Sequence, residues 1–116
     1  MEFNQNVPIY LQIIDLFKRK IVMNEYKPGQ KIESVRELAL KLEVNPNTVQ
    51  TALSELERMG IVKSERTIGR FISMDETLFK QMRAEIIEEK INTFLNELSE
   101  MGLSIDEVIH ELEGRK

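Results

Sequence analysis

The hydrophobic residues near the start of the chain recur with the spacing of a helix. Between residues 7 and 24 an apolar side chain stands at every fourth position, at Ile9, Ile13, Phe17 and Ile21. This spacing places them on one face of a helix, and Pro8 suits its first turn. The pattern therefore predicts a first helix, followed by a turn at residues 27–30.

Two further helices are predicted by start signals that lie close together. Ser34 followed three residues later by Glu37 is a capping box, and an apolar pattern of about two turns follows it. Asn45 before Pro46 combines a preferred N-cap residue with a preferred first helical residue. Gly60 suits the left-handed position that ends a helix. Two short helices separated by about three residues form the core of a helix-turn-helix.

Two short runs that suit strands follow, at residues 61–65 and 71–73. They flank a turn that contains Gly69, so they predict a β-hairpin. The turn also carries Arg66 and Arg70, whose side chains can bind backbone phosphate or enter a minor groove. Helix, helix, helix and hairpin in this order predict a winged helix-turn-helix, with the hairpin as the wing.

The last third of the chain predicts two helices. Apolar residues between positions 76 and 101 are interpreted as one continuous stripe on a long helix, which Gly102 ends. Ser104 and Glu107 form a second capping box, which begins a short final helix. The stripe needs a surface to cover it, which the first helix or a second copy of the chain would provide. The alternative to a dimer is a tail that folds back on its own DNA-binding domain. We therefore predict a dimerisation surface at Phe79, Met82, Ile86, Ile91, Phe94, Leu95 and Leu98.

The charge of this 116-residue chain is distributed unequally along its length. The formal net charge is −4, but residues 1–74 carry 11 Lys and Arg against 9 Asp and Glu, whereas residues 75–116 carry 5 against 11. Such an asymmetry indicates a division of labour. We predict a winged helix-turn-helix DNA-binding domain at residues 1–74 and a two-helix dimerisation tail at residues 75–116, so the fold is mainly α with a small β-hairpin.

The composition excludes several classes of function. The chain has no Cys and one His, so thiolate metal sites and cysteine nucleophiles are excluded, and we expect no metal and no cofactor. We find no motif for an enzyme's catalytic groups. No apolar run long enough for a membrane span and no secretory signal are present, so we expect a cytoplasmic protein with no membrane partner.

The helix that begins at Pro46 has a polar face suited to reading DNA. Asn47, Gln50, Thr51 and Ser54 are short, uncharged side chains on the side opposite the apolar face. Such groups can hydrogen-bond base edges in the major groove, and residues at the start of the second helix make these contacts in helix-turn-helix proteins. The free N–H groups expected at the start of this helix would also attract a phosphate. A winged-helix module that binds protein is the alternative.

Residues 8–72 resemble the DNA-binding domain of the GntR family of bacterial transcription regulators. The resemblance is carried by stretches along the whole segment, namely Pro8–Tyr10, Lys27–Ile32, Ser34–Ala39, Val44–Val49, Leu53–Ile61 and Gly69–Ile72. It implies that Arg36 contacts DNA, that Asn47, Thr48 and Gln50 touch bases and phosphates, and that Arg66 and Gly69 place the wing at a minor groove. The complete predicted DNA-binding set is Ser34, Arg36, Asn45, Asn47, Thr48, Gln50, Thr51, Arg66, Thr67 and Gly69.

The chain departs from the family pattern at several positions. Glycine is common in the family where Glu43 and Thr67 stand, and a left-handed conformation at Glu43 would cost about 1–2 kcal/mol. Arginine is common where Pro46 and Gln50 stand, so the usual guanine contacts are not carried over.

The short tail is similar to that of the YtrA type within the family. This implies a homodimer that binds an inverted-repeat operator in double-stranded DNA, often as a repressor of transporter operons. A small-molecule effector is left open, with a cavity between the tail helices and the first helix as its expected place.

Overall fold

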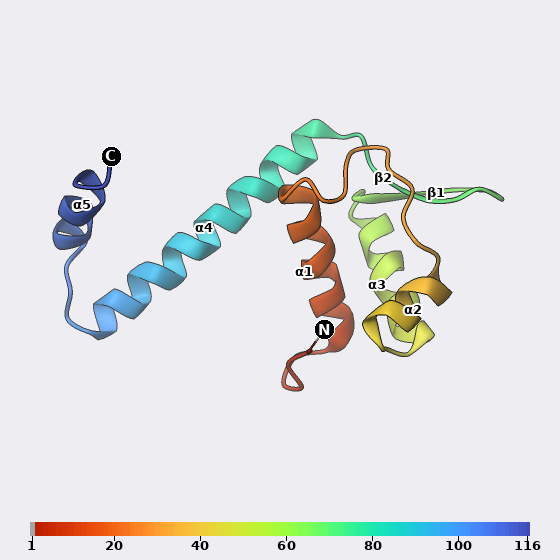
Figure 1. Ribbon diagram of the computed structural model, residues 1–116, viewed down its shortest axis with the longest axis horizontal. Coiled ribbons are helices and arrows are strands. Elements are labelled where there is room, and N and C mark those ends of the chain that lie inside the picture. The colour runs from red at the N-terminus through yellow and green to blue at the C-terminus, as the bar shows by residue number, and fades with distance from the viewer. Residues whose placement is uncertain (1) are drawn as a thin grey trace. The chain divides into compact units, whose positions relative to one another are not determined.

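The computed structural model describes residues 2–116, which form five helices and one two-stranded antiparallel sheet (Figure 1). The mainly α architecture with a small hairpin confirms the predicted fold class. The chain divides into two compact units, one that ends at Lys80 and one that comprises Gln81–Lys116.

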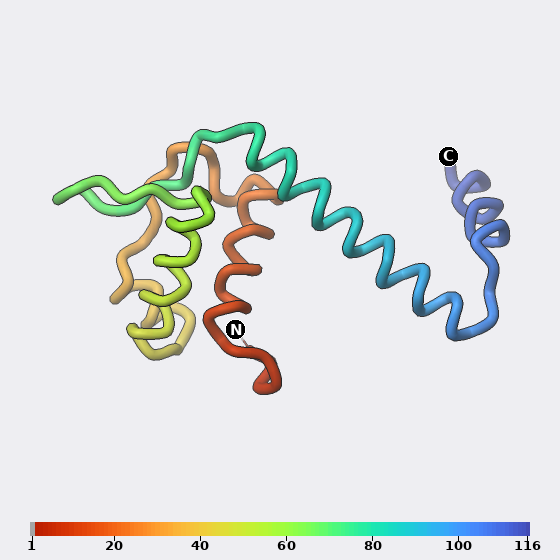
Figure 2. Tube along the Cα trace, turned by 180° about the vertical axis from the view of Figure 1, so that it is seen from behind, coloured from red at the N-terminus to blue at the C-terminus, as the bar shows by residue number. Residues whose placement is uncertain are grey.

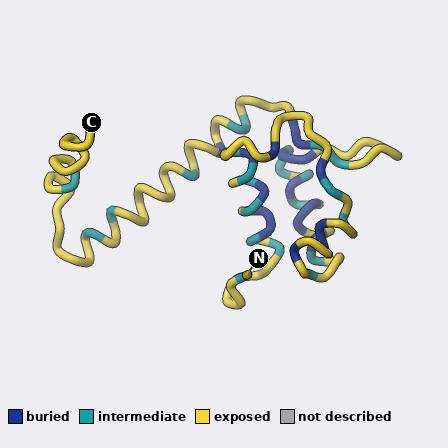
Figure 3. Tube along the Cα trace, viewed as in Figure 1, coloured by how far each residue is buried: buried dark blue, intermediate teal, exposed yellow. Residues whose placement is uncertain are grey.

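Three helices build the core of the first unit. They are α1 (Ile9–Val22), α2 (Val35–Leu42) and α3 (Pro46–Arg58), and α3 packs against both other helices and against the hairpin. Burial is concentrated on their facing sides and at the hairpin base (Figure 3). The largest fully buried side chains come from α1, from α3 and from the base of the hairpin: Ile13, Phe17, Val49, Leu53, Leu56, Ile61, Val62 and Ile72.

The hairpin consists of β1 (Val62–Glu65) and β2 (Gly69–Ile72), paired in antiparallel register from Val62 opposite Ile72 to Glu65 opposite Gly69. A single bridge from Lys31 to Phe71 adds the segment before α2 to its edge. The second strand begins two residues earlier than predicted, because Gly69 and Arg70 pair with β1 instead of lying in the turn. The hairpin tip is correspondingly shorter.

The junction between α3 and β1 is fixed by a glycine. Gly60 has φ = 80°, a left-handed conformation that glycine adopts at low cost. Its N–H donates to the Glu57 carbonyl at 3.0 Å, and the Ile61 N–H donates to the Leu56 carbonyl at 2.9 Å. These two bonds are a Schellman motif, and they confirm the predicted helix end.

The second unit contains most of α4 (Glu76–Glu100) and all of α5 (Ile105–Glu113). Gly102 has φ = 77° and lies where the chain turns from α4 into α5 (Figure 2). Ser104 accepts a hydrogen bond from the Glu107 N–H, and the Glu107 side chain accepts one from the Ser104 N–H. This confirms the second predicted capping box. None of the helices in residues 2–116 is both long enough and apolar enough to span a membrane.

The apolar residues of α4 form two faces instead of one continuous stripe. Phe79, Met82 and Ile86 follow one another at intervals of three and four residues, but the next apolar residue, Ile87, comes only one position later. One residue turns an α-helix by about 100°. From there a second face continues at alternating intervals of four and three, through Ile87, Ile91, Phe94, Leu98 and Met101. The spacing of this second face is that of a coiled-coil seam.

Candidate nucleic-acid interface

The start of α2 is held by the predicted capping box. The Ser34 Oγ accepts a hydrogen bond from the Glu37 N–H at 3.1 Å, and Glu37 Oε1 accepts one from the Ser34 N–H at 3.3 Å. The Ser34 hydroxyl hydrogen has no acceptor within residues 2–116, so it is left for a group outside them. Arg36 lies in the first turn with its side chain exposed. The first turn of α2 therefore offers one hydroxyl and one guanidinium to a phosphate.

The turn between α2 and α3 has the left-handed conformation that the family pattern implies. Glu43 ends α2 with φ = 57° and ψ = 47°, and its N–H donates to the Ala39 carbonyl. The Val44 N–H donates to the same carbonyl at 3.0 Å. This compact turn fixes the direction in which α3 starts.

The backbone amides at the start of α3 are already used within the chain. The Asn45 side-chain oxygen accepts from the Asn47 N–H at 2.8 Å, and the Asn45 carbonyl accepts from Thr48 and Val49 at 3.0 and 3.2 Å. Pro46 has no N–H. The expectation of free N–H groups for a phosphate was therefore wrong. The helix dipole remains, and the contacts that α3 offers come from its side chains.

The polar face of α3 is exposed at Asn47, Gln50, Thr51 and Ser54. The Thr51 hydroxyl donates to the Asn47 carbonyl at 3.0 Å, and the Gln50 Nε2 donates to the Ser54 Oγ at 3.1 Å. Within residues 2–116 the Asn47 side chain makes no hydrogen bond, so its amide is free for a base edge. Thr48 is half-buried, so it has less surface to offer than the other four.

The hairpin tip presents a short exposed segment. Arg66, Thr67, Ile68 and Gly69 are exposed, and two of them have positive φ angles, 66° at Thr67 and 132° at Gly69. A Cβ atom on Gly69 would lie 3.1 Å from the Cε of Lys31, so a side chain there would be both strained and crowded. Ile68, which the sequence analysis did not single out, places an apolar side chain beside the predicted Arg66 contact.

Arg70 does not lie at the hairpin tip. It is part of β2, opposite Ser64 of β1, and its Nε donates to Glu57 Oε1 of α3 at 2.6 Å. Ser64 donates to the same carboxylate oxygen, and Arg70 Nη2 lies 3.5 Å from Gln50 Oε1. Burial acts to raise the pKa of Glu57, but the hydrogen bond from Ser64 and the charge of Arg70 outweigh it and lower this pKa. Glu57 is therefore held ionised beside Arg70.

The predicted dimerisation residues differ in how much surface they offer. Ile91 and Phe94 are exposed, each by 46%, whereas Met82 is only 4% exposed and therefore has no surface left for a second chain. Four others are half-buried, namely Phe79, Ile86, Leu95 and Leu98. Exposed apolar residues that the prediction did not include lie near them in sequence, at Ile87, Met101, Leu103, Ile105, Ile109 and Leu112.

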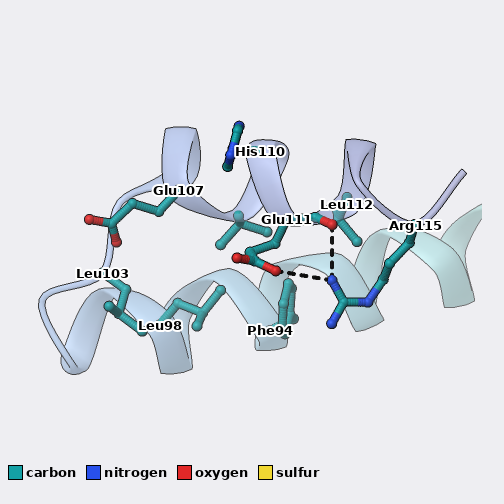
Figure 4. Close-up of a pocket in the computed structure, with 9 residues that line it drawn as sticks. Phe94, Leu98, Leu103, Glu107, His110, Glu111, Leu112 and Arg115 are labelled. Carbon is teal, nitrogen blue, oxygen red and sulfur yellow. Dashed lines mark hydrogen bonds and ion pairs between the residues drawn. The ribbon is translucent and has the colours of Figure 1, made fainter.

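An apolar groove of about 640 Å³ lies between the end of α4 and α5 (Figure 4). Phe94 and Leu98 line it from α4, and Leu112 lines it from α5. At its rim Arg115 donates to the carbonyl and the carboxylate of Glu111, at 2.9 and 3.2 Å. Among residues 2–116 there is no group of three or more His, Cys, Asp or Glu that could hold a metal ion.

Comparison with known proteins identifies the family. The family model described as "Bacterial regulatory proteins, gntR family" matches residues 9–72, which span α1 to the end of β2. The chain belongs to the GntR family. The GntR segment contains every residue of the predicted DNA-binding set.

Two curated GntR relatives from Bacillus subtilis strain 168 match nearly the whole chain. The regulator YhcF is 39% identical over 93% of this chain and 89% of its own length. The repressor YtrA is 36% identical over 91% of this chain and 82% of its own length. The predicted resemblance to the YtrA type is thus confirmed, and this GntR protein is related to transcription regulators and not to enzymes.

A solved GntR structure shares the complete fold. The GntR family transcriptional regulator from Listeria monocytogenes has a TM-score of 0.86 and 36% sequence identity, and the match covers 97% of this chain and 98% of that one. The likeness therefore extends beyond the winged helix into α4 and α5. This GntR chain is a DNA-binding transcription regulator of the helix-turn-helix class.

Proposed function

We propose that this GntR regulator binds an inverted-repeat operator as a homodimer and represses the genes behind it. The observation that carries the proposal is the exposed, uncharged face at the start of α3, in a unit that also exposes Arg36 on α2 and Arg66 on the hairpin tip. In helix-turn-helix proteins this end of the second helix reaches the major groove.

The proposed division of labour on DNA follows from the chemistry of the groups. Asn47 and Gln50 carry amides, which can pair with adenine through a donor and an acceptor, and the Thr51 methyl group can contact a thymine methyl. Arg36 and Arg66 are cations, which contribute sequence-independent attraction to phosphate. The amides therefore select the sequence, and the arginines supply affinity. Ser34 adds a phosphate contact through its remaining hydroxyl hydrogen.

A binding assay with two matched double variants tests the reading face. Asn47→Ala with Gln50→Ala should abolish specific retardation of the promoter fragment upstream of the protein's own operon, with an unchanged circular dichroism spectrum. Asn92→Ala with Asn96→Ala removes two exposed amides from α4 and should bind as the wild type does. Specific binding retained by the first variant would refute the assignment of this face. Binding without a steep dependence on salt would favour a protein partner instead.

The homodimer is proposed on the exposed apolar surface of the second unit. Ile87, Ile91, Phe94 and Leu98 share one face of α4 at coiled-coil spacing, and α5 exposes Ile105, Ile109 and Leu112. Exposed apolar residues that gather on one helix face mark an interaction site in a soluble protein when they form a large patch. A second copy fits the requirement of a helix-turn-helix protein for two-fold symmetry on a palindromic site. We therefore move the proposed interface from Phe79, Met82 and Ile86 toward the second face.

The dimer proposal is tested by adding one charge on either side of α4. Phe94→Glu places a carboxylate in the middle of the second face, whereas Asn92→Glu places it about 200° round the same helix. We expect Phe94→Glu to sediment as a single chain and to lose tight operator binding. Asn92→Glu should sediment as a dimer. A dimeric Phe94→Glu variant would show that the interface lies elsewhere.

Repression, location and control complete the proposal. The relative YtrA is named a repressor, and by this analogy the protein acts as a repressor. The resemblance of the sequence to the YtrA type suggests a transporter operon as the target to examine first, and a protein that regulates bacterial genes would act in the cytoplasm. Transcription in vitro from the promoter of that operon should fall when the protein is added.

For the effector, we move the expected place from a cavity beside the first helix to the groove of Figure 4, which is lined by α4 and α5 and has the size of a small-molecule site. The groove shares Phe94 and Leu98 with the proposed dimer surface. A ligand of this groove should raise Tm and change operator affinity together.

A further inference from the structure

We infer that Arg70 is a positioning residue for base reading, which holds the Gln50 amide and the wing in fixed relation to α3 and does not itself contact DNA. This inference rests on the proposed function, in which Gln50 reads a base. It concerns an arginine that a sequence-based view places at the wing tip, among the groups that bind phosphate.

The contacts of Arg70 connect three elements of the first unit. Its Nε donates to Glu57 on α3 at 2.6 Å, and Glu57 also accepts from Ser64, the cross-strand partner of Arg70. The Glu57 carboxylate on α3 therefore binds both strands of the hairpin, at one cross-strand pair. This arrangement fixes the base of the wing against α3, although the wing tip beyond it is exposed.

The same guanidinium orients the Gln50 amide. Arg70 Nη2 lies 3.5 Å from Gln50 Oε1, and Gln50 Nε2 donates to Ser54 at 3.1 Å. A cation on one side and a hydroxyl on the other determine which end of the amide carries the oxygen. Each end keeps one free position, because the amide oxygen has two lone pairs and the nitrogen has two hydrogens. A fixed amide with one free donor and one free acceptor is what bidentate pairing with adenine requires.

A direct phosphate contact by Arg70 is disfavoured by its partner. The side chains of Arg70 and Glu57 are only 25% and 31% exposed, so the pair is partly removed from solvent. If Arg70 turned to a phosphate, the Glu57 carboxylate would lose its cation and remain close to the negatively charged backbone. Like charges repel, so the intact pair is the favourable state beside DNA.

The test measures binding of the full-length protein to a promoter fragment and to a set of single-base-pair variants, at several salt concentrations. Gln50→Ala first identifies the base pair that Gln50 reads, as the position where discrimination disappears. Arg70→Met should then reduce discrimination at that same base pair by roughly tenfold, within the range of one bidentate contact. The salt dependence of binding should stay that of the wild type. Loss of a phosphate contact would instead lower the slope of log binding constant against log salt concentration by about 0.9 for each subunit.

Glu57→Gln provides the second variant, because the two explanations predict opposite results for it. If Arg70 positions Gln50 through the pair with Glu57, this variant also loses discrimination at the Gln50 base pair. The double variant Arg70→Met with Glu57→Gln then loses no more than either single variant. If Arg70 binds phosphate, removal of the carboxylate frees the guanidinium and tightens binding to all sequences.

Four outcomes overturn the inference. A lower salt slope in Arg70→Met, or uniformly tighter binding by Glu57→Gln, assigns Arg70 to the phosphate backbone and leaves the proposed function intact. Unchanged discrimination in Arg70→Met refutes the positioning role alone. Unchanged discrimination in Gln50→Ala shows that the proposed reading face is wrong, and the inference falls with it. Denaturant unfolding of each variant verifies that the measurements are made on folded protein.

Discussion

Glu43 carries a backbone strain that a single substitution should relieve. Its φ of 57° and ψ of 47° lie in the left-handed region, where a side chain crowds the following carbonyl. The Glu43 side chain is exposed, and within residues 2–116 its carboxylate forms no ion pair. Glycine adopts the same conformation without a Cβ atom. Glu43→Gly should therefore stabilise the fold and preserve the turn between α2 and α3.

The expected gain is the difference between two effects. The left-handed conformation costs a residue other than glycine about 1–2 kcal/mol. Glycine loses part of this advantage, about 0.4–1 kcal/mol, because it is more flexible in the unfolded chain. The net increase in the free energy of unfolding is about 1 kcal/mol. For a domain of this size that corresponds to a rise in Tm of roughly 4–8 °C.

Glu43→Gln is the matched control. The Glu43 carboxylate lies at the negative end of the α2 dipole, so its removal alone adds some stability. Glu43→Gln removes the charge and keeps the strain, and the difference between the Gly and Gln variants isolates the backbone effect. Urea unfolding at one fixed protein concentration measures that difference. A Gly variant no more stable than the Gln variant would refute the reasoning.

A reverse substitution examines the same principle at a second site. Gly60 has φ = 80°, and a Cβ atom there would lie 3.9 Å from Leu78 Cδ2, which is an ordinary contact. Gly60→Ala should therefore lower the free energy of unfolding by about 1 kcal/mol through backbone strain alone. A Gly60→Ala variant with the same free energy of unfolding as the wild type would contradict the assignment of strain at Gly60 and at Glu43.

Two more predictions concern the region around α2. Ser34→Ala removes the cap on the Glu37 N–H and should lower the free energy of unfolding by about 1 kcal/mol in urea unfolding. At Glu33, burial acts to raise the pKa, but hydrogen bonds from its own backbone, from Lys41 and from Tyr26 outweigh it, so this pKa is lowered. The stabilisation is present above the usual glutamate pKa of about 4.3 and is lost as pH falls below it. At pH values below this pKa, the free energies of unfolding of wild type and Glu33→Gln should converge. A difference between them that stays constant down to pH 2 would contradict this.

The helix boundaries could be predicted because their signals are local. The Ser34 and Ser104 capping boxes and the Gly60 helix end depend on hydrogen bonds between residues a few positions apart, and the structure contains all of them. The signal for the capped start of α3 is also local. Asn45 caps one backbone N–H and Pro46 has none, so the free amides expected there are absent from the start of α3. That error came from an incomplete interpretation of a signal that was present.

The role of Arg70 could not be predicted in this way. Its partner Glu57 is 13 residues away in sequence, and they meet only because the hairpin folds back on α3. The two apolar faces of α4 are intermediate between a local signal and a long-range contact. The one-residue step from Ile86 to Ile87 is visible in the sequence, but its meaning depends on a helix that stays regular through it, which the structure shows for Glu76–Glu100.

The reading face of α3 has a consequence for a bacterium under osmotic stress. Asn47, Gln50 and Thr51 are uncharged, and the exposed cations stand apart from them at Arg36 and Arg66. When cytosolic potassium rises, the ions compete with the arginines and weaken attachment to every stretch of the chromosome alike. Hydrogen bonds between neutral groups and bases release no counterions. We therefore expect a hypertonic shock to lower the occupancy of all targets while their rank order is preserved.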